Sequence, residues 1–503
     1  MRHLDESAPA CLPIKRHFRA VVCVLIASLA AGTQVSAQPE PLHLNQDEAV
    51  QRALSRNFSI AIERFSPLIA AQELRGAWGE YDPAFTTRYT FTKDDNYQAQ
   101  FPALEYRQDD FSSGIEGKVP WLGTQYAIAL DAYDTRTNRN NFDDANAINS
   151  FAGLTLTQPL LRGFGGGSLA KVRIARRGAQ SADEGFRQTV IDVVTNTVYA
   201  YNNYFFASRN LDVAQRSRDL AAQLLEDNRF RSDTGAIAPL DVVLAESELA
   251  LREENVINAR RQKRQAELAL ADLISDQAGT LIGPGIVVEA PKAGTEVSVD
   301  AGSDFPRALE NRPDYRQAKL SLESKELELS RDRNGMLPQL DLVGSYGWRG
   351  QSDSFHGSFD DLGRNRTQAY SAGAVLSVPI PNRDRASRKA ISYMRRNQAD
   401  LQLKRLEQTV RLNLEDAALR LSTGWQRLQA AQKAVNLARQ SLTAEEKKLR
   451  AGTSTTFVVL RVQQDVSSAE ILQADAIADY AKAIAEYDRQ LGLTLERRNI
   501  TLE

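Results

Sequence analysis

The sequence contains little of several residue types on which common protein classes depend. Its 503 residues include 2 cysteines, 4 histidines and 3 methionines. Two cysteines cannot form a disulfide scaffold. Both cysteines and two of the four histidines precede residue 38, so a chain cleaved there would have too few of either for a zinc-finger or multi-histidine metal site. Basic and acidic residues are nearly balanced, at 62 and 64, which disfavours a partner held mainly by charge, such as bulk nucleic acid. We therefore expect no metal, no cofactor and no nucleic acid.

Long apolar runs are also almost absent. Only residues 20–31 approach the apolar length with which a helix crosses a bilayer, so a membrane protein built from several spanning helices is excluded. Basic residues precede this run and the small-residue pattern Val35-Ser36-Ala37 follows it, as in a secretory signal peptide. We expect residues 1–37 to be a cleaved signal peptide. Cleavage would remove both cysteines and leave an exported protein that depends on packing alone.

Several short motifs occur twice in the chain, in the same order. Arg52-Ala53-Leu54 returns as Arg307-Ala308-Leu309, and Gln188-Thr189-Val190 returns as Gln408-Thr409-Val410. A Gly- and Pro-rich stretch at residues 279–302 separates the two sets. Because the paired motifs keep their order, we expect two copies of one structural unit.

Each repeat is predicted to combine a strand group with helices. The expected limits are residues 38–280, with a strand group at 83–160, and residues 281–503, with a strand group at 338–380. Apolar and polar residues alternate in Phe85–Thr92, which is typical of a strand with one apolar and one polar face. We expect two strands per group. The first group is longer, and its additional residues form either an extended extracellular hairpin or further strands.

Long helical patterns follow each strand group. Residues 169–231 and 384–450 contain no proline and would form helices of roughly 90 to 100 Å. In each repeat a glycine turn follows, and then a second helical pattern, at residues 239–277 and 457–491. The sequence therefore predicts one long antiparallel helical hairpin per repeat.

Two-faced strands in an exported chain without a spanning helix indicate a membrane β-barrel. In such a barrel the apolar face is outside and the polar face lines the lumen. The four strands expected from one chain are too few, because known barrels have about 8 or more. Closure would require oligomerisation, and three chains would supply 12 strands.

Further motifs lie where the predicted elements meet. Leu156-Thr157-Gln158-Pro159-Leu160-Leu161-Arg162-Gly163-Phe164-Gly165 and Val378-Pro379-Ile380-Pro381-Asn382 close the two strand groups. Ala308-Leu309-Glu310-Asn311-Arg312-Pro313-Asp314 opens the second repeat. Gly235–Val242 and Gly452–Leu460 follow the long helices. With these motifs the chain resembles, over essentially its whole mature length, the TolC-like outer-membrane factors, the exit ducts of Gram-negative efflux pumps and type I secretion systems.

The resemblance implies an architecture and a function. The fold would be mainly α-helical, with a trimeric 12-stranded outer-membrane barrel continuous with an α-helical tunnel across the periplasm. The homotrimer would be a passive export channel rather than an enzyme. Its tip would dock on a periplasmic adaptor (membrane fusion) protein and an inner-membrane transporter, and its barrel would contact outer-membrane lipid.

The resemblance also implies where the periplasmic aperture lies. Family members often close it with acidic side chains just after the tip glycines, and Asp241 matches that position in the first repeat. In the second repeat the two corresponding positions are Val458 and Arg461, which departs from the family pattern. Asp241 has an alternative explanation as a first-turn residue favoured by the helix dipole.

The same resemblance implies adaptor docking at the hairpin tips, around Gly235, Ala236, Gly452 and Thr453. A simpler explanation of the glycines is that any helical hairpin needs a glycine turn.

Two other classes of protein remain as alternatives. For an enzyme, the glycine-rich residues 163–167 lack the spacing of a phosphate-binding loop, and no acidic pair lies in a recognisable catalytic setting. A periplasmic coiled-coil adaptor or scaffold of an export complex would explain the helical hairpins. It would not explain two groups of strands with one apolar and one polar face.

Overall fold

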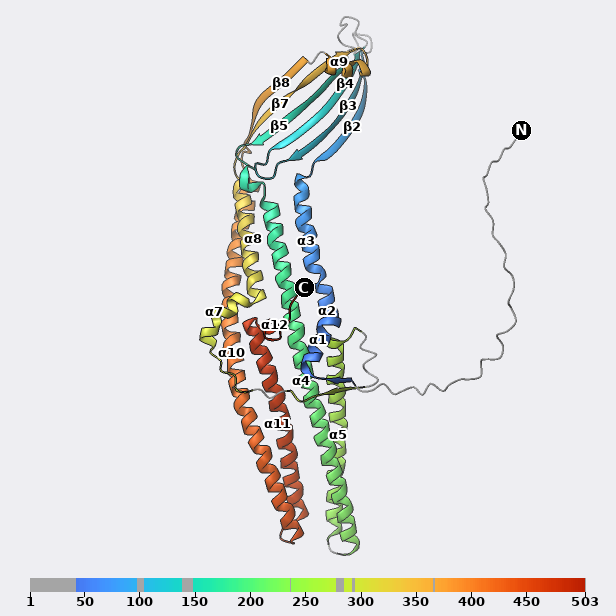
Figure 1. Cartoon of the computed structure of the whole chain (residues 1–503), viewed down its shortest axis with the longest axis vertical. Coiled ribbons are helices and arrows are strands. Elements are labelled where there is room, and N and C mark those ends of the chain that lie inside the picture. Colours follow the sequence, from blue (N-terminus) through green and yellow to red (C-terminus); the bar gives the residue numbers. More distant parts are fainter. Residues whose placement is uncertain are drawn as a thin grey trace, which may run out of the picture.

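The molecule is elongated, with a curved sheet at one end and helical hairpins extending to the other (Figure 1). The computed structural model describes residues 42–96, 104–137, 148–235, 237–276, 285–291, 295–364 and 367–502. The expected signal peptide lies outside these residues. Within them, no helix has both the length and the apolar character needed to cross a bilayer.

The first half runs from a short strand through helices into the sheet and back out into a long hairpin. Its elements are β1 (Leu42–Leu44), α1 (Gln46–Arg56), α2 (Phe58–Glu63), α3 (Phe65–Trp78), β2 (Ala84–Asn96), β3 (Leu104–Lys118), β4 (Gln125–Thr137), β5 (Ile148–Pro159), α4 (Ala170–Asp233) and α5 (Pro239–Ile274). A capping box at Asn45 and Glu48 fixes the start of α1, because each side chain accepts a hydrogen bond from the other residue's backbone N–H.

The second half follows a similar order with a shorter strand group. Its elements are β6 (Ile286–Val288), α7 (Ala301–Asn311), α8 (Pro313–Gly335), β7 (Gln339–Ser352), α9 (Phe355–Arg364), β8 (Thr367–Ser377), α10 (Arg383–Arg450), α11 (Thr456–Leu491) and α12 (Thr494–Arg497). The predicted long helices are confirmed: α4 has 64 residues and α10 has 68, so each is about 100 Å long. A mainly helical fold with a strand group in each half is likewise confirmed.

The strand groups of the two halves form one sheet. Its order is β2-β3-β4-β5-β7-β8, and every neighbouring pair is antiparallel. The expectation of four strands per chain is therefore wrong, since the sheet has six. The additional residues of the first group are strands of the common sheet, because β3 and β4 pair along 13 positions from Tyr106↔Thr137 to Lys118↔Gln125. The prediction of a 12-stranded barrel assumed four strands from each of three chains, so it is wrong for the same reason.

A helix that was not predicted interrupts the second strand group. Helix α9 lies between β7 and β8 and packs on the sheet at the end remote from the long helices (Figure 1). Ser150 Oγ on β5 donates to the Ser358 backbone carbonyl at 2.8 Å. At Gly350 a Cβ would lie 2.2 Å from the same carbonyl oxygen, so glycine permits the close approach.

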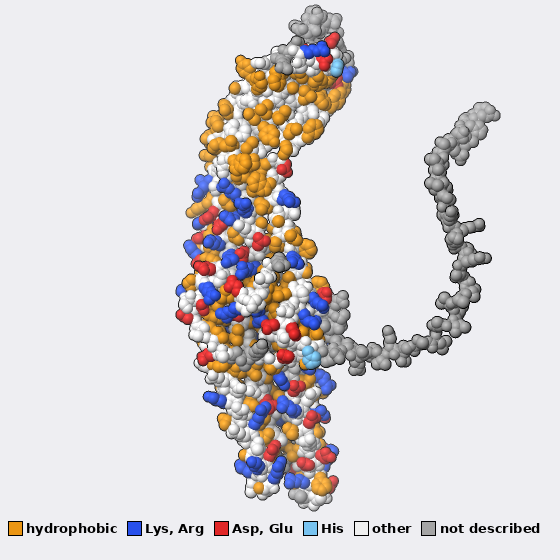
Figure 2. Space-filling view, viewed as in Figure 1, with side chains coloured by type: hydrophobic (Ala, Val, Ile, Leu, Met, Phe, Trp, Pro, Cys, Tyr) orange, Lys and Arg blue, Asp and Glu red, His pale blue; other side chains and the backbone are white. Residues whose placement is uncertain are grey.

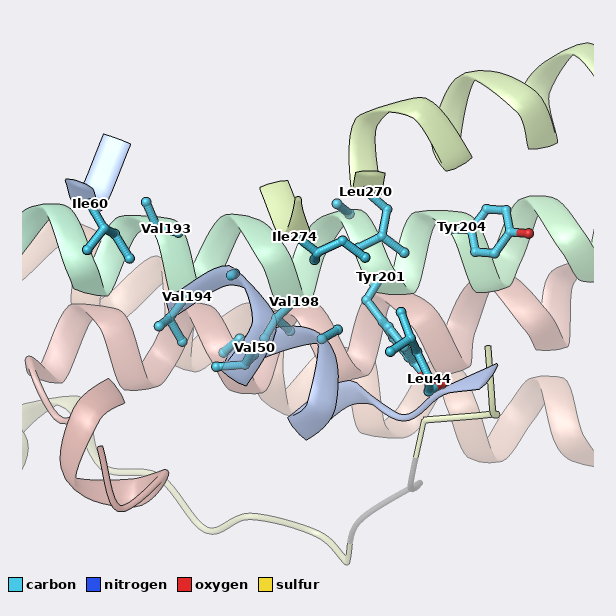
Figure 3. Packing of buried hydrophobic residues seen from close by; sticks show 14 of the residues in the cluster. Leu44, Val50, Ile60, Val193, Val194, Val198, Tyr201, Tyr204, Leu270 and Ile274 are labelled. Atoms are coloured by element: carbon cyan, nitrogen blue, oxygen red, sulfur yellow. The ribbon is translucent and has the colours of Figure 1, made fainter. Parts of the chain in front are cut away.

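Two hydrophobic cores lie where the long helices pass the small elements. The first gathers apolar residues of α1, α2, α4 and α5, and Figure 3 shows its side chains converging on α4. In it Tyr201 of α4 donates to the backbone carbonyls of Leu44 and Glu289, both at 3.0 Å. These acceptors adjoin the parallel pair β1–β6, so one tyrosine ties the long helix to both halves of the chain. The second core gathers residues of α7, α10 and α11, with Leu414 and Tyr480 buried at its centre.

A polar cluster joins the two long hairpins near these cores. Tyr199 of α4 donates to Glu486 Oε2 of α11 at 2.5 Å, and Arg489 pairs with Glu486 at 2.7 Å. Arg489 also lies 3.6 Å from Asp192 of α4. Burial acts to raise the pKa of Glu486, but hydrogen bonds from Arg489, Tyr199 and Gln490 outweigh it and lower this pKa to about 2. The Glu486 carboxylate is therefore held ionised between the two halves.

We expect this cluster to make stability depend on pH in the acid range. A glutamate has a pKa of about 4.3 when unfolded, so a folded pKa near 2 contributes roughly 3 kcal/mol at most. That contribution is complete above about pH 5 and is lost as the pH falls through 4 towards 2. Glu486→Gln should flatten the fall of thermal stability between pH 5 and 2.5, measured by circular dichroism. Glu246→Gln removes only the exposed ion pair with Arg229 and should leave the profile as in the wild type.

Candidate functional site

One face of the six-stranded sheet is apolar across its whole width. The pairing register places Phe85, Ile115, Ile128, Leu154, Tyr346 and Tyr370 in one continuous row, one residue from each strand. All six side chains are exposed, from 38% at Leu154 to 81% at Tyr370. Figure 2 shows hydrophobic side chains gathered over the strands, whereas charged side chains are spread over the helices. Such a large exposed apolar surface indicates contact with lipid or another apolar partner.

The opposite face of the sheet is polar and hollowed. One residue along each strand from the apolar row lies a row of the opposite face, which consists of Ala84, Glu116, Ala127, Thr155, Ser345 and Ser371. A hollow of about 800 Å³ is lined by Phe151, Arg349 and Thr367, which form part of another row on the polar face. The two faces inferred from Phe85–Thr92 thus continue across the sheet in these rows.

Aromatic side chains are concentrated on the apolar face. By register, Tyr89, Tyr126, Tyr346 and Trp348 lie on this face. Tyr346 and Trp348 pack edge to face with ring centroids 5.8 Å apart. A further aromatic residue, Trp121, lies in the turn between β3 and β4 and is 70% exposed.

At the far end of the molecule each helical hairpin turns through a left-handed glycine. Gly235 follows α4 with φ of 74° and Gly452 follows α10 with φ of 75°. The backbone N–H of Thr453 donates to the Lys448 carbonyl at 3.0 Å, which satisfies one of the last carbonyls of α10. Apolar side chains remain exposed just beyond both turns, including Leu240 and Phe457.

The two hairpin tips enclose a common cavity of about 720 Å³. It brings together Asp241, Arg461 and Gly452 from the predicted set, with Arg231 and Phe457 also in the wall. The sequence did not reveal this association, because α4–α5 and α10–α11 meet only in the fold.

Three other predicted residues of the tips, all within the described part of the chain, lie outside the cavity wall. Val458 lies in the first turn of α11 and is 38% exposed, while Gly235 and Thr453 lie in the turns. Ala236 lies outside the described residues. The structure therefore groups Asp241 with Arg461 in one cavity wall and separates both from the turn glycine of the first tip.

A charged triad connects the hairpins between the tips and the cores. Glu470 of α11 pairs with Arg439 of α10 at 2.7 Å and with Arg216 of α4 at 3.2 Å. The glutamate side chain is 13% exposed, whereas both arginines are more than half exposed. Its position links the two hairpins laterally. No group of three or more His, Cys, Asp or Glu side chains is placed to hold a metal ion in the described part of the chain.

Comparison with known proteins identifies what this arrangement is similar to. Residues 102–275 and 305–493 match the family model described as "Outer membrane efflux protein". Nodulation protein T of Rhizobium leguminosarum bv. trifolii is 22% identical over 310 residues, which cover 59% of this chain and 62% of that protein. Outer membrane protein TolC of Escherichia coli is 24% identical over 363 residues, covering 68% of this chain and 70% of TolC.

A solved structure shares the fold. The CmeC outer membrane channel of Campylobacter jejuni superposes with a TM-score of 0.67 over 89% of this chain and 86% of its own, at 15% sequence identity. At 89% of this chain, the match includes most of the architecture described above.

Proposed function

The chain belongs to the outer membrane efflux protein family, and from this premise we propose that it forms the outer-membrane exit duct of a tripartite efflux or type I secretion system. Three copies would surround one passage. Their sheets would close in the outer membrane, and their long helices would form a tunnel through the periplasm. The duct is passive, and energy for export comes from its partner transporter.

One observation carries this proposal: the apolar row from Phe85 to Tyr370 is exposed on one face of a sheet whose other face is polar. Only contact with lipid makes such a row favourable on the outside while the polar face lines water. The α4–α5 and α10–α11 hairpins extend from this sheet by about 100 Å, enough to reach deep into the periplasm. A coiled-coil scaffold would need the hairpins but not the sheet.

The tips are the proposed contact with an adaptor protein and, through it, with an inner-membrane transporter. Gly235, Gly452 and Thr453 lie at the ends of the hairpins, where a partner can reach them. Ala236, the fourth residue proposed for this contact, lies outside the described residues. The exposed apolar side chains of Leu240 and Phe457 support docking, because exposed apolar side chains at a tip favour a protein partner.

Asp241, Val458 and Arg461 are the proposed lining of the periplasmic aperture. Asp241 and Arg461 share the cavity between the tips, so opposite charges meet where the tunnel narrows. Such a mixed ring attracts cations less strongly than a purely acidic one.

We expect Asp241→Ala to reduce cation selectivity. The change removes one negative charge per copy at the aperture, so the permeability ratio of K⁺ to Cl⁻ should fall by roughly twofold or more. The reversal potential of single channels under a KCl gradient measures this ratio. Asp233→Ala, which removes an aspartate at the same tip but outside the cavity wall, is the matched control. An unchanged reversal potential in both variants would remove Asp241 from the pore.

Deletion of the gene tests the proposed function itself. A strain without the protein should accumulate a fluorescent efflux substrate or retain a secreted protein in the cell, and the wild-type gene should restore export. The protein should fractionate with outer membranes and need detergent for extraction. Extraction as a monomer in buffer alone would contradict the proposal.

A further inference from the structure

The hairpin of β3 and β4 is an addition within the first strand group. Strand β2 follows α3 as β7 follows α8, and β5 leads towards α4 as β8 leads towards α10. The two strands without counterparts in the second half are therefore β3 and β4. They are inserted between β2 and β5, in the interior of the sheet.

This hairpin is fixed at the junction of sheet and helices. Lys118 Nζ lies 2.7 Å from Glu80 Oε1 and stands over the Tyr81 ring, 5.6 Å from its centroid. Thr124 Oγ1 donates to Gln158 Oε1 at 2.5 Å. Gly123 has φ of 70°, and a Cβ there would lie 2.5 Å from the Gly163 carbonyl oxygen, so the turn packs directly on the chain leaving β5. Fixed in this way, β3 and β4 are part of the wall of the sheet.

The two edge strands of the sheet are β2 and β8, with 13 and 11 residues. Long edges with free backbone groups cannot remain open in a bilayer, because each unpaired N–H and C=O is costly in hydrocarbon. All pairs are antiparallel and the strand number is even, so β8 of one copy would run antiparallel to β2 of the next. The complementary edge is thus supplied by a second copy of the same chain.

We propose that β8 pairs with β2 of the neighbouring copy and that three copies close an 18-stranded barrel, six strands from each. This inference rests on the proposed trimeric duct and specifies its pore. With strands about 4.8 Å apart and tilted by about 40°, an 18-stranded wall has a diameter of about 36 Å, against about 24 Å for 12 strands.

The wider barrel stands on a narrower helical base. Each chain contributes six strands to the sheet. In the described part of the chain, four helices adjoin these strands, α3, α4, α8 and α10. The turn of β3 and β4 joins no helix and forms a rim at the base of the barrel, with Trp121 and Leu122 exposed. Tryptophan at that level suits the membrane interface. The wide barrel leaves the restriction on passing molecules to the tunnel and the tips.

Spin labels on the barrel wall test the strand number. Thr90→Cys places one label per copy on the polar face of β2, and both native cysteines precede residue 38. The three labels of a trimer are equally spaced around the circular wall, so the straight-line distance between any two of them is about 0.87 of the barrel diameter. Electron–electron double resonance on the purified trimer should therefore give a distance near 30 Å for 18 strands and near 20 Å for 12, from about 4.8 Å strand spacing and about 40° tilt.

Deleting residues 104–147 provides the matched variant, because it removes β3 and β4 and leaves β2 to pair with β5. The distance should then shorten by about a third, as the diameter follows strand number. A distance near 20 Å in the undeleted trimer would overturn the 18-stranded barrel and leave the duct intact. If light scattering shows that no trimer forms, the proposed function fails instead.

Discussion

Replacing Leu154 with arginine is expected to remove the protein from the outer membrane, whereas the same replacement at Thr155 is expected to leave it there. The two residues are adjacent on β5, near the middle of the strand. Leu154 belongs to the exposed apolar row and Thr155 to the polar face. Arginine on the lipid face at the bilayer midplane costs about 2 to 4 kcal/mol, and a trimer would bear that cost three times.

The measurement for this pair is the amount of protein in separated outer membranes and its migration as a trimer on unheated gels. Leu154→Arg should reduce the trimer at least tenfold, since about 1.4 kcal/mol corresponds to a factor of ten. Thr155→Arg should assemble at wild-type levels and change only ion selectivity, because the added charge faces the lumen. Equal loss from both variants would show that the two faces do not differ in environment.

Alanine at Gly492 is expected to cause the largest loss of stability among the glycine positions of the helix ends. Gly492 ends α11 with φ of 72°, and its N–H donates to the Arg489 carbonyl at 3.0 Å. A Cβ there would lie 2.7 Å from the Asn311 carbonyl carbon and 2.9 Å from the Arg312 nitrogen. Both are backbone atoms where α7 meets α8, so they cannot move aside as a side chain can.

Gly452 offers a matched control for this substitution. It also ends a long helix, with φ of 75°, but a Cβ would meet nothing within 4 Å. Gly452→Ala should therefore cost only the left-handed strain, about 1 to 2 kcal/mol. Gly492→Ala should add the cost of overpacking, for a total of roughly 2 to 5 kcal/mol. Thermal loss of the helical circular dichroism signal should shift clearly further for Gly492→Ala than for Gly452→Ala. Similar shifts would show that the backbone contact at Asn311 yields easily.

The helices could be predicted from the sequence because their signals are local. The long runs in α4 and α10 contain no proline, and a glycine follows each one where the chain reverses. Alternating residues likewise predicted β2, because a strand with two different faces shows its period in a few residues.

The number of strands could not be predicted in the same way. The additional residues of the first strand group were expected to form either an extended hairpin or further strands. Which of the two they form depends on pairing between β3 and β2 and between β4 and β5, which no local pattern encodes. Helix α9 was missed although Phe355, Phe359 and Leu362 have helical spacing, because ten residues between two strands read equally well as a loop.

The tips illustrate the same limit for the candidate site. Asp241 and Arg461 were each identified through the family resemblance, at positions that follow the glycine turn of one hairpin. Their common cavity arises because α4 packs beside α11, which brings together residues more than 200 positions apart. Sequence position predicted the residues, and only tertiary packing placed them together.

The central claim is that identical sheets join edge to edge into a closed ring of three. Cysteine cross-linking between the sheet edges tests this claim most directly. One cysteine would replace Arg88, Thr90 or Thr92 on β2 and a second would replace Ala369, Ser371 or Gly373 on β8, all on the polar face. Oxidation of intact cells should give dimers and trimers on denaturing gels for at least one pair, with no larger species. No cross-linked species for any pair, or a ladder that continues beyond the trimer, would contradict the account.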